Sequence, residues 1–122
     1  MNKFFVISKG TEYLRIPARN LIYISAAGNY SEVVMLDGRK KIVSYQLGQL
    51  ADMINDQLED EGERFVRIGR SLIINKDYVH WIDTAKQEIV LSDCAGCYHE
   101  LKASREVLVS FKAFLEALWK ND

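Results

Sequence analysis

The residues with the clearest capacity for chemistry are polar side chains on three short segments between β-prone runs. Residues 26–31 form a small-residue turn with amide, phenol and hydroxyl groups, and residues 69–71 place Arg70 between two apolar stretches. Residues 101–106 place Arg105 where a strand is expected to give way to a helix. An exposed arginine can donate two hydrogen bonds to a guanine edge, and hydroxyl groups suit phosphate oxygens. These segments indicate nucleic-acid recognition, although ordinary turn chemistry would give the same pattern.

The sequence holds no group of residues typical of an active site. Its two histidines are His80 and His99, and alternation along residues 78–83 predicts that His80 is packed rather than catalytic. Residues 68–71 lack the second glycine and the lysine of a phosphate-binding loop. We therefore predict that the chain is not an enzyme and needs no cofactor.

The two cysteines form a single unit, Cys94-Ala95-Gly96-Cys97. With His80 or His99 they could form half of a zinc site, or they could act as a redox pair. There is no second such unit, and this one does not open a predicted helix. We predict a tight hairpin turn that binds no metal, and a redox role stays open.

Composition is that of an ordinary soluble domain. The 122 residues are 48% hydrophobic and 27% charged, which fits one domain with a sizeable core. No apolar run approaches the ~20 residues of a membrane span, and the apolar stretch near the N-terminus is too short for a signal peptide. We therefore expect a cytoplasmic protein.

Charge is unevenly distributed along the chain. The net charge is −1, but residues 52–63 hold six acids and no base. Without them, 16 basic residues face 17 − 6 = 11 acidic residues, a balance of +5. One face can be basic while another is acidic, because salt screens each field within about 8–10 Å. Charge therefore permits DNA binding without predicting it.

Short β-prone runs separated by turn signals predict a mainly β, β-rich α+β fold of short antiparallel sheets. Spacings of three and four predict one mid-chain helix over residues 46–58 and one C-terminal helix from Ser104 to about Trp119. The Asp37-Gly38 pair predicts a two-residue type I′ turn. The expected strands are residues 3–8, 12–16, 21–26, 30–36, 39–44, 65–68, 72–74, 78–83, 88–92 and 98–103.

Three strings resemble the LytTR DNA-binding domain of bacterial response regulators: LIYISAAGNYSEVVMLDG, FVRIGRSLIINKDYV and LKASREVL. They occur in this order and spacing, and the resemblance runs from about Ile16 to Leu118. It implies a sequence-specific, double-stranded DNA-binding transcription regulator from a two-component system. It also implies loops that enter successive major grooves of a direct-repeat site and bend the DNA.

The resemblance assigns roles position by position. Tyr30, Arg70 and Arg105 match the base-contacting sites. Arg105 matches an arginine of the family, whereas the other two positions hold histidine and asparagine in some members. Arginine favours guanine and asparagine favours adenine, so the target sequence is expected to differ. The expected backbone contacts are Asn29, Ser31, Ser71, Asn75, Lys76 and Ser104.

The family usually joins this domain to a phosphorylated receiver. Here we expect residues 1–122 to be a single LytTR-like domain without a receiver, either a stand-alone regulator or a fragment of a longer protein. In a stand-alone regulator, concentration, a protein partner or self-association on DNA would set its activity. Two other functions stay open. Residues 52–63 could dock a protein partner, and Tyr23, Tyr30 and Tyr45 could stack single-stranded RNA bases, although no RNA-binding string is present.

Overall fold

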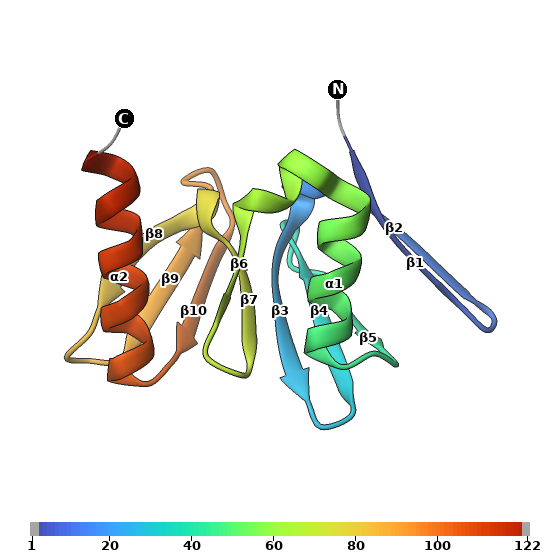
Figure 1. The fold of residues 1–122 in the computed structure, drawn as a ribbon, viewed down its shortest axis with the longest axis horizontal. Coiled ribbons are helices and arrows are strands. Elements are labelled where there is room, and N and C mark those ends of the chain that lie inside the picture. The colour runs from blue at the N-terminus through green and yellow to red at the C-terminus, as the bar shows by residue number, and fades with distance from the viewer. Residues whose placement is uncertain (1–2, 121–122) are drawn as a thin grey trace. The chain divides into compact units, whose positions relative to one another are not determined.

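The computed structural model describes residues 3–120 and divides the chain into two compact units, Met1–Asp77 and Tyr78–Asp122. Each unit combines short antiparallel strands with one α-helix (Figure 1). The predicted fold class, with one mid-chain and one C-terminal helix, is confirmed.

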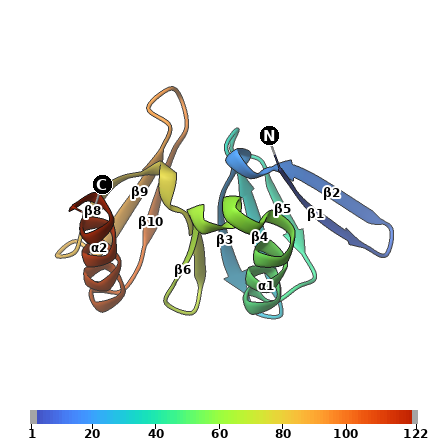
Figure 2. The same ribbon diagram turned by 45° about the horizontal axis from the view of Figure 1, so that its top comes forward.

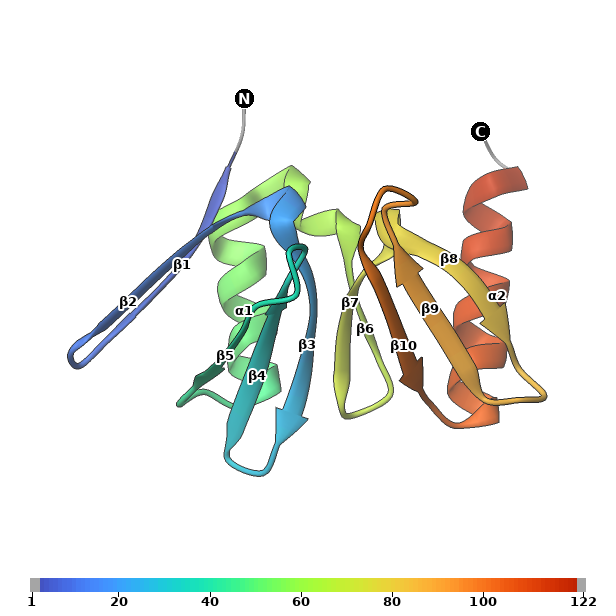
Figure 3. The same ribbon diagram turned by 180° about the vertical axis from the view of Figure 1, so that it is seen from behind.

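A five-stranded antiparallel sheet forms the centre of the first unit, in the order β5-β4-β3-β7-β6 (Figure 3). Its central strand β3 pairs with β4 on one side and with β7 on the other. The sheet therefore brings the middle string of the sequence beside the first one. The strands are β3 (Leu21–Ala27), β4 (Tyr30–Met35), β5 (Lys40–Val43), β6 (Phe65–Ile68) and β7 (Leu72–Asn75).

Helix α1 (Leu47–Leu58) covers one face of this sheet. Its buried residues recur at spacings of three and four, so they form one apolar stripe: Leu47, Leu50, Ile54 and Leu58. They meet sheet residues that include Ile24, Val33 and Ile73. Each fully buried side chain of this kind contributes roughly 1.5–3 kcal/mol relative to exposure. A capping box between Gln46 and Gln49 begins the helix.

Strands β1 (Phe4–Lys9) and β2 (Glu12–Pro17) form a separate hairpin in the first unit. Phe5 and Ile16 face each other across it and belong to the core under α1. The side-chain amide of Gln57 accepts a hydrogen bond from the Val6 N–H and donates one to the Val6 carbonyl, each at 2.8 Å. Gln57 therefore imitates a neighbouring strand and fastens the hairpin to α1.

The second unit is a three-stranded sheet in the order β10-β9-β8, covered by helix α2 (Figure 2). Strands β8 (Val79–Asp83), β9 (Glu88–Ser92) and β10 (Tyr98–Lys102) are antiparallel, and α2 spans Arg105–Lys120. Leu108 and Phe111 of α2 are buried, as are Ile89 and Leu91 of β9. Within residues 3–120, no helix combines the length and the hydropathy needed to cross a membrane.

Three 3₁₀ helices were not predicted: η1 (Ala18–Asn20), η2 (Glu59–Arg64) and η3 (Lys76–Tyr78). The acidic run, residues 52–63, covers the second part of α1 and most of η2. Some of its carboxylates bind other groups of the same unit. Glu61 accepts a hydrogen bond from the Lys3 N–H at 2.9 Å and pairs with Arg64 at 3.5 Å. Lys3 also pairs with Glu59 at 3.3 Å. These contacts give the acidic run a partly structural role.

The predicted type I′ turn at Asp37-Gly38 is wrong. The connection between β4 and β5 spans residues 36–39, and of this pair only Gly38 has a positive φ, of 90°. The Gly38 N–H donates to the Met35 carbonyl at 2.9 Å, which closes the turn one residue earlier than expected. A type I turn followed by a left-handed glycine is the usual alternative when a hairpin loop exceeds two residues.

Replacing Gln57 with alanine should loosen the β1–β2 hairpin. The substitution leaves the Val6 N–H and carbonyl without these partners, so the free energy of unfolding should fall by about 1–3 kcal/mol. Urea denaturation would measure the loss of free energy, and the amide proton of Val6 should exchange faster with solvent. Asn55→Ala on the exposed side of α1 is the matched control. Unchanged protection of the Val6 amide in Gln57→Ala would contradict the role given to this side chain.

Candidate nucleic-acid interface

Two of the three polar segments lie side by side at one end of the five-stranded sheet. Ser25 pairs with Leu72 in the β3–β7 ladder, and the Ala26 N–H donates to the Ser71 carbonyl at 2.8 Å. The β3–β4 turn and the β6–β7 turn therefore end the sheet together, as Figure 3 shows. This arrangement places Tyr30 and Arg70 on neighbouring turns.

Both turns have a backbone that holds their polar residues in place. Gly28 has a φ of 67° and Gly69 a φ of 61°, values that glycine adopts without steric cost. Gly28 is the first residue of the two-residue link between the paired Ala27 and Tyr30, as in a type II′ turn. Tight turns between paired strands have few conformations, so their side chains are presented in a fixed direction.

The side chains on these turns are open to solvent. Tyr30 is 51% exposed, and Asn29, Arg70 and Ser71 are exposed as well. Within residues 3–120, Arg70 forms no ion pair, and neither does Arg105. Their guanidinium groups thus keep all five donors for an outside partner.

The third segment begins helix α2 in the second unit. The Ser104 hydroxyl accepts a hydrogen bond from the Val107 N–H at 3.3 Å, and its carbonyl accepts one from Leu108 at 3.0 Å. The Ala103 N–H donates to the Gln87 carbonyl at 3.3 Å, which ties the junction to the last residue of the β8–β9 turn. Ser104 is therefore an N-cap, as predicted, and Arg105 is an exposed residue of the first turn.

A family model described as the LytTr DNA-binding domain matches residues 11–116, a range that includes all three segments. The chain belongs to the LytTR DNA-binding domain family. The family is one of DNA-binding domains, which agrees with the prediction of a DNA-binding protein that is not an enzyme.

A solved structure with a similar fold is the LytTr DNA-binding domain of a Bacillus cereus protein described as a methyl-accepting/DNA response regulator. The two chains are 16% identical, with a TM-score of 0.63. The match covers 93% of this chain and 96% of the other. A search of curated proteins finds no match.

Two residues expected to contact the DNA backbone have structural roles in this LytTR domain. Ser31 is fully buried, and its hydroxyl donates to the Tyr45 carbonyl at 2.7 Å. Asn75 is fully buried too, and its amide donates to the Leu21 carbonyl at 3.0 Å and accepts from the Asp77 N–H at 3.1 Å. Burial leaves neither side chain available to DNA, so both assignments are corrected. Proximity to a turn predicts that a polar residue is exposed, but these two satisfy backbone groups inside the unit.

Lys76 does not lie beside the two turns. It follows β7 at the end of the strand opposite to Ser71, and its ammonium lies 3.7 Å from the Asp77 carboxylate. Its side chain is 22% exposed. The group formed by the turns therefore consists of Asn29, Tyr30, Arg70 and Ser71.

The Cys94–Cys97 unit closes the β9–β10 hairpin, as the turn interpretation predicted. Asp93 accepts hydrogen bonds from the Ala95 and Cys97 N–H groups, both at 2.9 Å, and these bonds lower the pKa of its carboxyl group. Burial, with the nearby Asp93 charge, raises the pKa of the Cys97 thiol. Within residues 3–120, no group of three or more His, Cys, Asp or Glu side chains is arranged to hold a metal ion.

His80 is exposed, so the prediction that it is packed inside is wrong. The β8–β9 register shifts between Val79 and Trp81, which breaks the alternation on which that prediction relied. The His80 Nδ1 atom instead lies 3.6 Å from the Cys94 Sγ atom in the β9–β10 loop.

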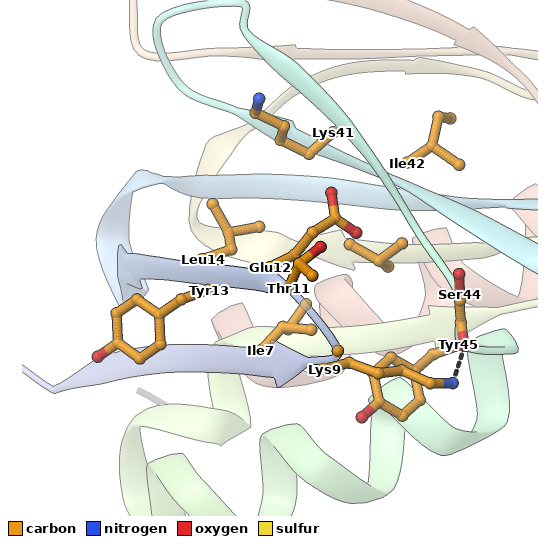
Figure 4. A pocket seen from close by; sticks show the side chains of 12 residues that line it. Ile7, Lys9, Thr11, Glu12, Tyr13, Leu14, Lys41, Ile42, Ser44 and Tyr45 are labelled. Atoms are coloured by element: carbon orange, nitrogen blue, oxygen red, sulfur yellow. Dashed lines mark hydrogen bonds between the residues drawn. The ribbon is translucent and has the colours of Figure 1, made fainter.

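A hollow of about 450 Å³ that no sequence pattern predicts lies between the β1–β2 hairpin and β5 (Figure 4). Its walls include Ile7, Leu14 and Ile42. At its rim the Lys9 ammonium donates to the Ser44 carbonyl at 2.8 Å and lies 4.4 Å from the centre of the Tyr45 ring. The segments that form the hollow are distant in sequence, so only the tertiary fold reveals it.

Replacing Asn75 with alanine should destabilise the domain without any DNA present. The Leu21 carbonyl would stay buried without this partner, so the free energy of unfolding should fall by about 1–3 kcal/mol. Asn29→Ala, at an exposed turn position, should change it by less than about 0.5 kcal/mol. Equal stabilities of the two variants in urea denaturation would contradict the structural role of Asn75.

Cys94 should react with iodoacetamide before Cys97. Cys94 is exposed, whereas Cys97 is buried and its raised pKa leaves less thiolate at neutral pH. Mass spectrometry of peptides taken at successive times would give the two rates, and the urea-unfolded protein supplies the control, in which the difference should largely disappear. Faster labelling of Cys97 in the folded protein would contradict this order.

Proposed function

We propose that this LytTR domain is a transcription regulator that recognises duplex DNA by sequence, with its turns in successive major grooves. The main support is the position of Tyr30 and Arg70 on neighbouring turns, where both are exposed and Arg70 forms no ion pair within residues 3–120. The hydrogen bond from the Ala26 N–H to the Ser71 carbonyl holds the two turns beside each other in the DNA-free protein. A preformed pair of this kind binds with little loss of conformational entropy.

In this proposal Arg70 and Arg105 each donate two hydrogen bonds to the O6 and N7 atoms of guanine. The Tyr30 hydroxyl can donate to or accept from a base edge. Asn29, Ser71 and the capping residue Ser104 lie beside these three residues and suit phosphate oxygens. Ser104 retains its hydroxyl proton for such a contact, because its oxygen accepts the bond from Val107.

We further propose that the two units act together as one DNA-binding domain in the bacterial cytoplasm. Both units carry a proposed base contact, Arg70 in the first and Arg105 in the second. Two copies would bind a direct repeat, because copies in the same orientation on one face of the duplex need equivalent half-sites.

Alanine at Arg70 or Arg105 should weaken specific binding. Each substitution should cost about 1–3 kcal/mol, or roughly 5- to 150-fold in Kd, and should relax the preference at one base pair. Electrophoretic mobility shifts on a selected site and on its single-base variants would measure both effects. Arg39→Ala is the control, because it removes one exposed charge beside β5, at the end of β4 opposite to Tyr30. If all three variants bound like the unmodified protein, the assignment of the base contacts would be wrong.

Selection of bound duplexes from a random pool should enrich a direct repeat. The expected spacing between half-sites is about one helical turn, roughly 10–10.5 base pairs. Sequencing of the bound fraction gives the repeat and the bases at each position. Enrichment of AT-rich DNA without a motif would contradict sequence-specific recognition.

A further inference from the structure

Lys9 holds its ammonium group at a fixed place on the first unit. The residue ends β1, at the tip of the β1–β2 hairpin. Its ammonium donates to the Ser44 carbonyl at 2.8 Å and lies 4.4 Å from the centre of the Tyr45 ring, and Figure 4 shows the bond to Ser44. An ammonium has three N–H donors, so one bond to a carbonyl leaves it able to bind another acceptor. The group is therefore positioned but not saturated.

No acidic side chain neutralises this charge within the part of the chain that the structure describes. Glu12 is the partner of Lys9 in the hairpin register, yet the two form no ion pair. A carbonyl dipole and the negative face of an aromatic ring attract an ammonium without cancelling its charge. Lys9 therefore carries a full positive charge that an anion can approach, because the residue is exposed.

This charge lies at the same end of the five-stranded sheet as Tyr30. Val43 of β5 pairs with Ser31, the residue after Tyr30 on β4. Ser44 directly follows Val43, so it lies beside Tyr30, one strand spacing away, or roughly 4.8 Å. Strand β5 is the last of the sheet, and the hairpin lines the hollow on its free side. Lys9 therefore lies one step farther from Tyr30 than Ser44 does.

The sideways distance from Tyr30 to Lys9 fits the geometry of a DNA groove. A major groove is about 12 Å wide, so each sugar–phosphate backbone lies roughly 6 Å from its middle. One strand spacing and the 2.8 Å hydrogen bond to Ser44 together carry the Lys9 ammonium slightly farther than this from Tyr30. When Tyr30 meets base edges, Lys9 is therefore beside a phosphate and not over a base.

We propose that Lys9 donates to a DNA phosphate at the border of the major groove that Tyr30 enters. The proposal rests on the function proposed above and gives the β1–β2 hairpin a part in it. A contact between lysine and phosphate adds affinity and fixes position without reading sequence. The bonds from Gln57 to Val6 hold the hairpin on α1, so little conformational entropy is lost when the contact forms.

The salt dependence of DNA binding tests this contact. Lys9→Gln removes the charge but keeps an amide that can donate to the Ser44 carbonyl. In fluorescence anisotropy on a selected site, the slope of log K against log salt concentration should become shallower by about 0.9, the value for one lost phosphate contact. Lys9→Arg should retain the slope. Lys40→Gln is the matched control, because it removes the same charge four residues before Ser44, about 13 Å away along β5, and should change the slope far less. Thermal unfolding without DNA checks that each variant folds.

The position of the contacted phosphate gives a second readout. Replacing single phosphates of the site with uncharged methylphosphonates should reveal one position that weakens binding of the unmodified chain but not that of Lys9→Gln. Preferences among single-base variants of the site should be the same for both proteins. An unchanged slope in Lys9→Gln, or an equal change in Lys40→Gln, would overturn this contact while the DNA-binding proposal stands. Failure of the unmodified chain to bind any selected duplex would instead overturn the DNA-binding proposal, and this contact with it.

Discussion

The antiparallel register between β3 and β7 is the constraint on which the first unit depends. In this register Leu72 pairs with Ser25, and the next backbone hydrogen bond runs from the Ala26 N–H to the Ser71 carbonyl. A slip of one residue would send every side chain of β7 to the opposite face of the sheet. Burial of Ile73 against α1 prevents that slip, so core packing also fixes where the β6–β7 turn lies. The position of Arg70 is thus a consequence of hydrophobic burial several residues away.

The polar residues of this unit divide into two groups with different physical roles. Ser31 and Asn75 satisfy backbone carbonyls in places that water cannot reach. Asn29 and Arg70 remain in solvent, where forming a new hydrogen bond requires no internal one to break. Sequence position does not separate the groups, because buried Ser31 directly follows exposed Tyr30 on β4. On β4, alternation points Tyr30 and Ser31 to opposite faces, whereas every residue of β7, including Asn75, is buried.

Much of the fold could be predicted because its signals are local. The spacing of Leu47, Leu50, Ile54 and Leu58 indicated α1, and alternation with turn residues indicated the strands to within one or two residues. The wrong predictions came from structural irregularities that the periodicity of hydrophobic residues does not reveal. A register shift beside His80 exposed a side chain expected inside, and a four-residue connection changed the turn at Gly38. The neighbourhood of Tyr30 and Arg70 depends on pairing between strands nearly fifty residues apart, so only the family resemblance indicated it in advance.

The free edges of the first unit have a consequence for solubility. Strand β5 ends the five-stranded sheet, and the hairpin forms a sheet of only two strands, so both present unpaired backbone groups. Such edges invite intermolecular strand pairing and fibril growth. Lys40 and Lys41 occupy half of β5, and Pro17 ends β2 with no N–H to donate. A strand from another molecule would have to bury lysine charge at β5, and at Pro17 it would find no backbone N–H to accept. Both features keep these edges from becoming templates for aggregation.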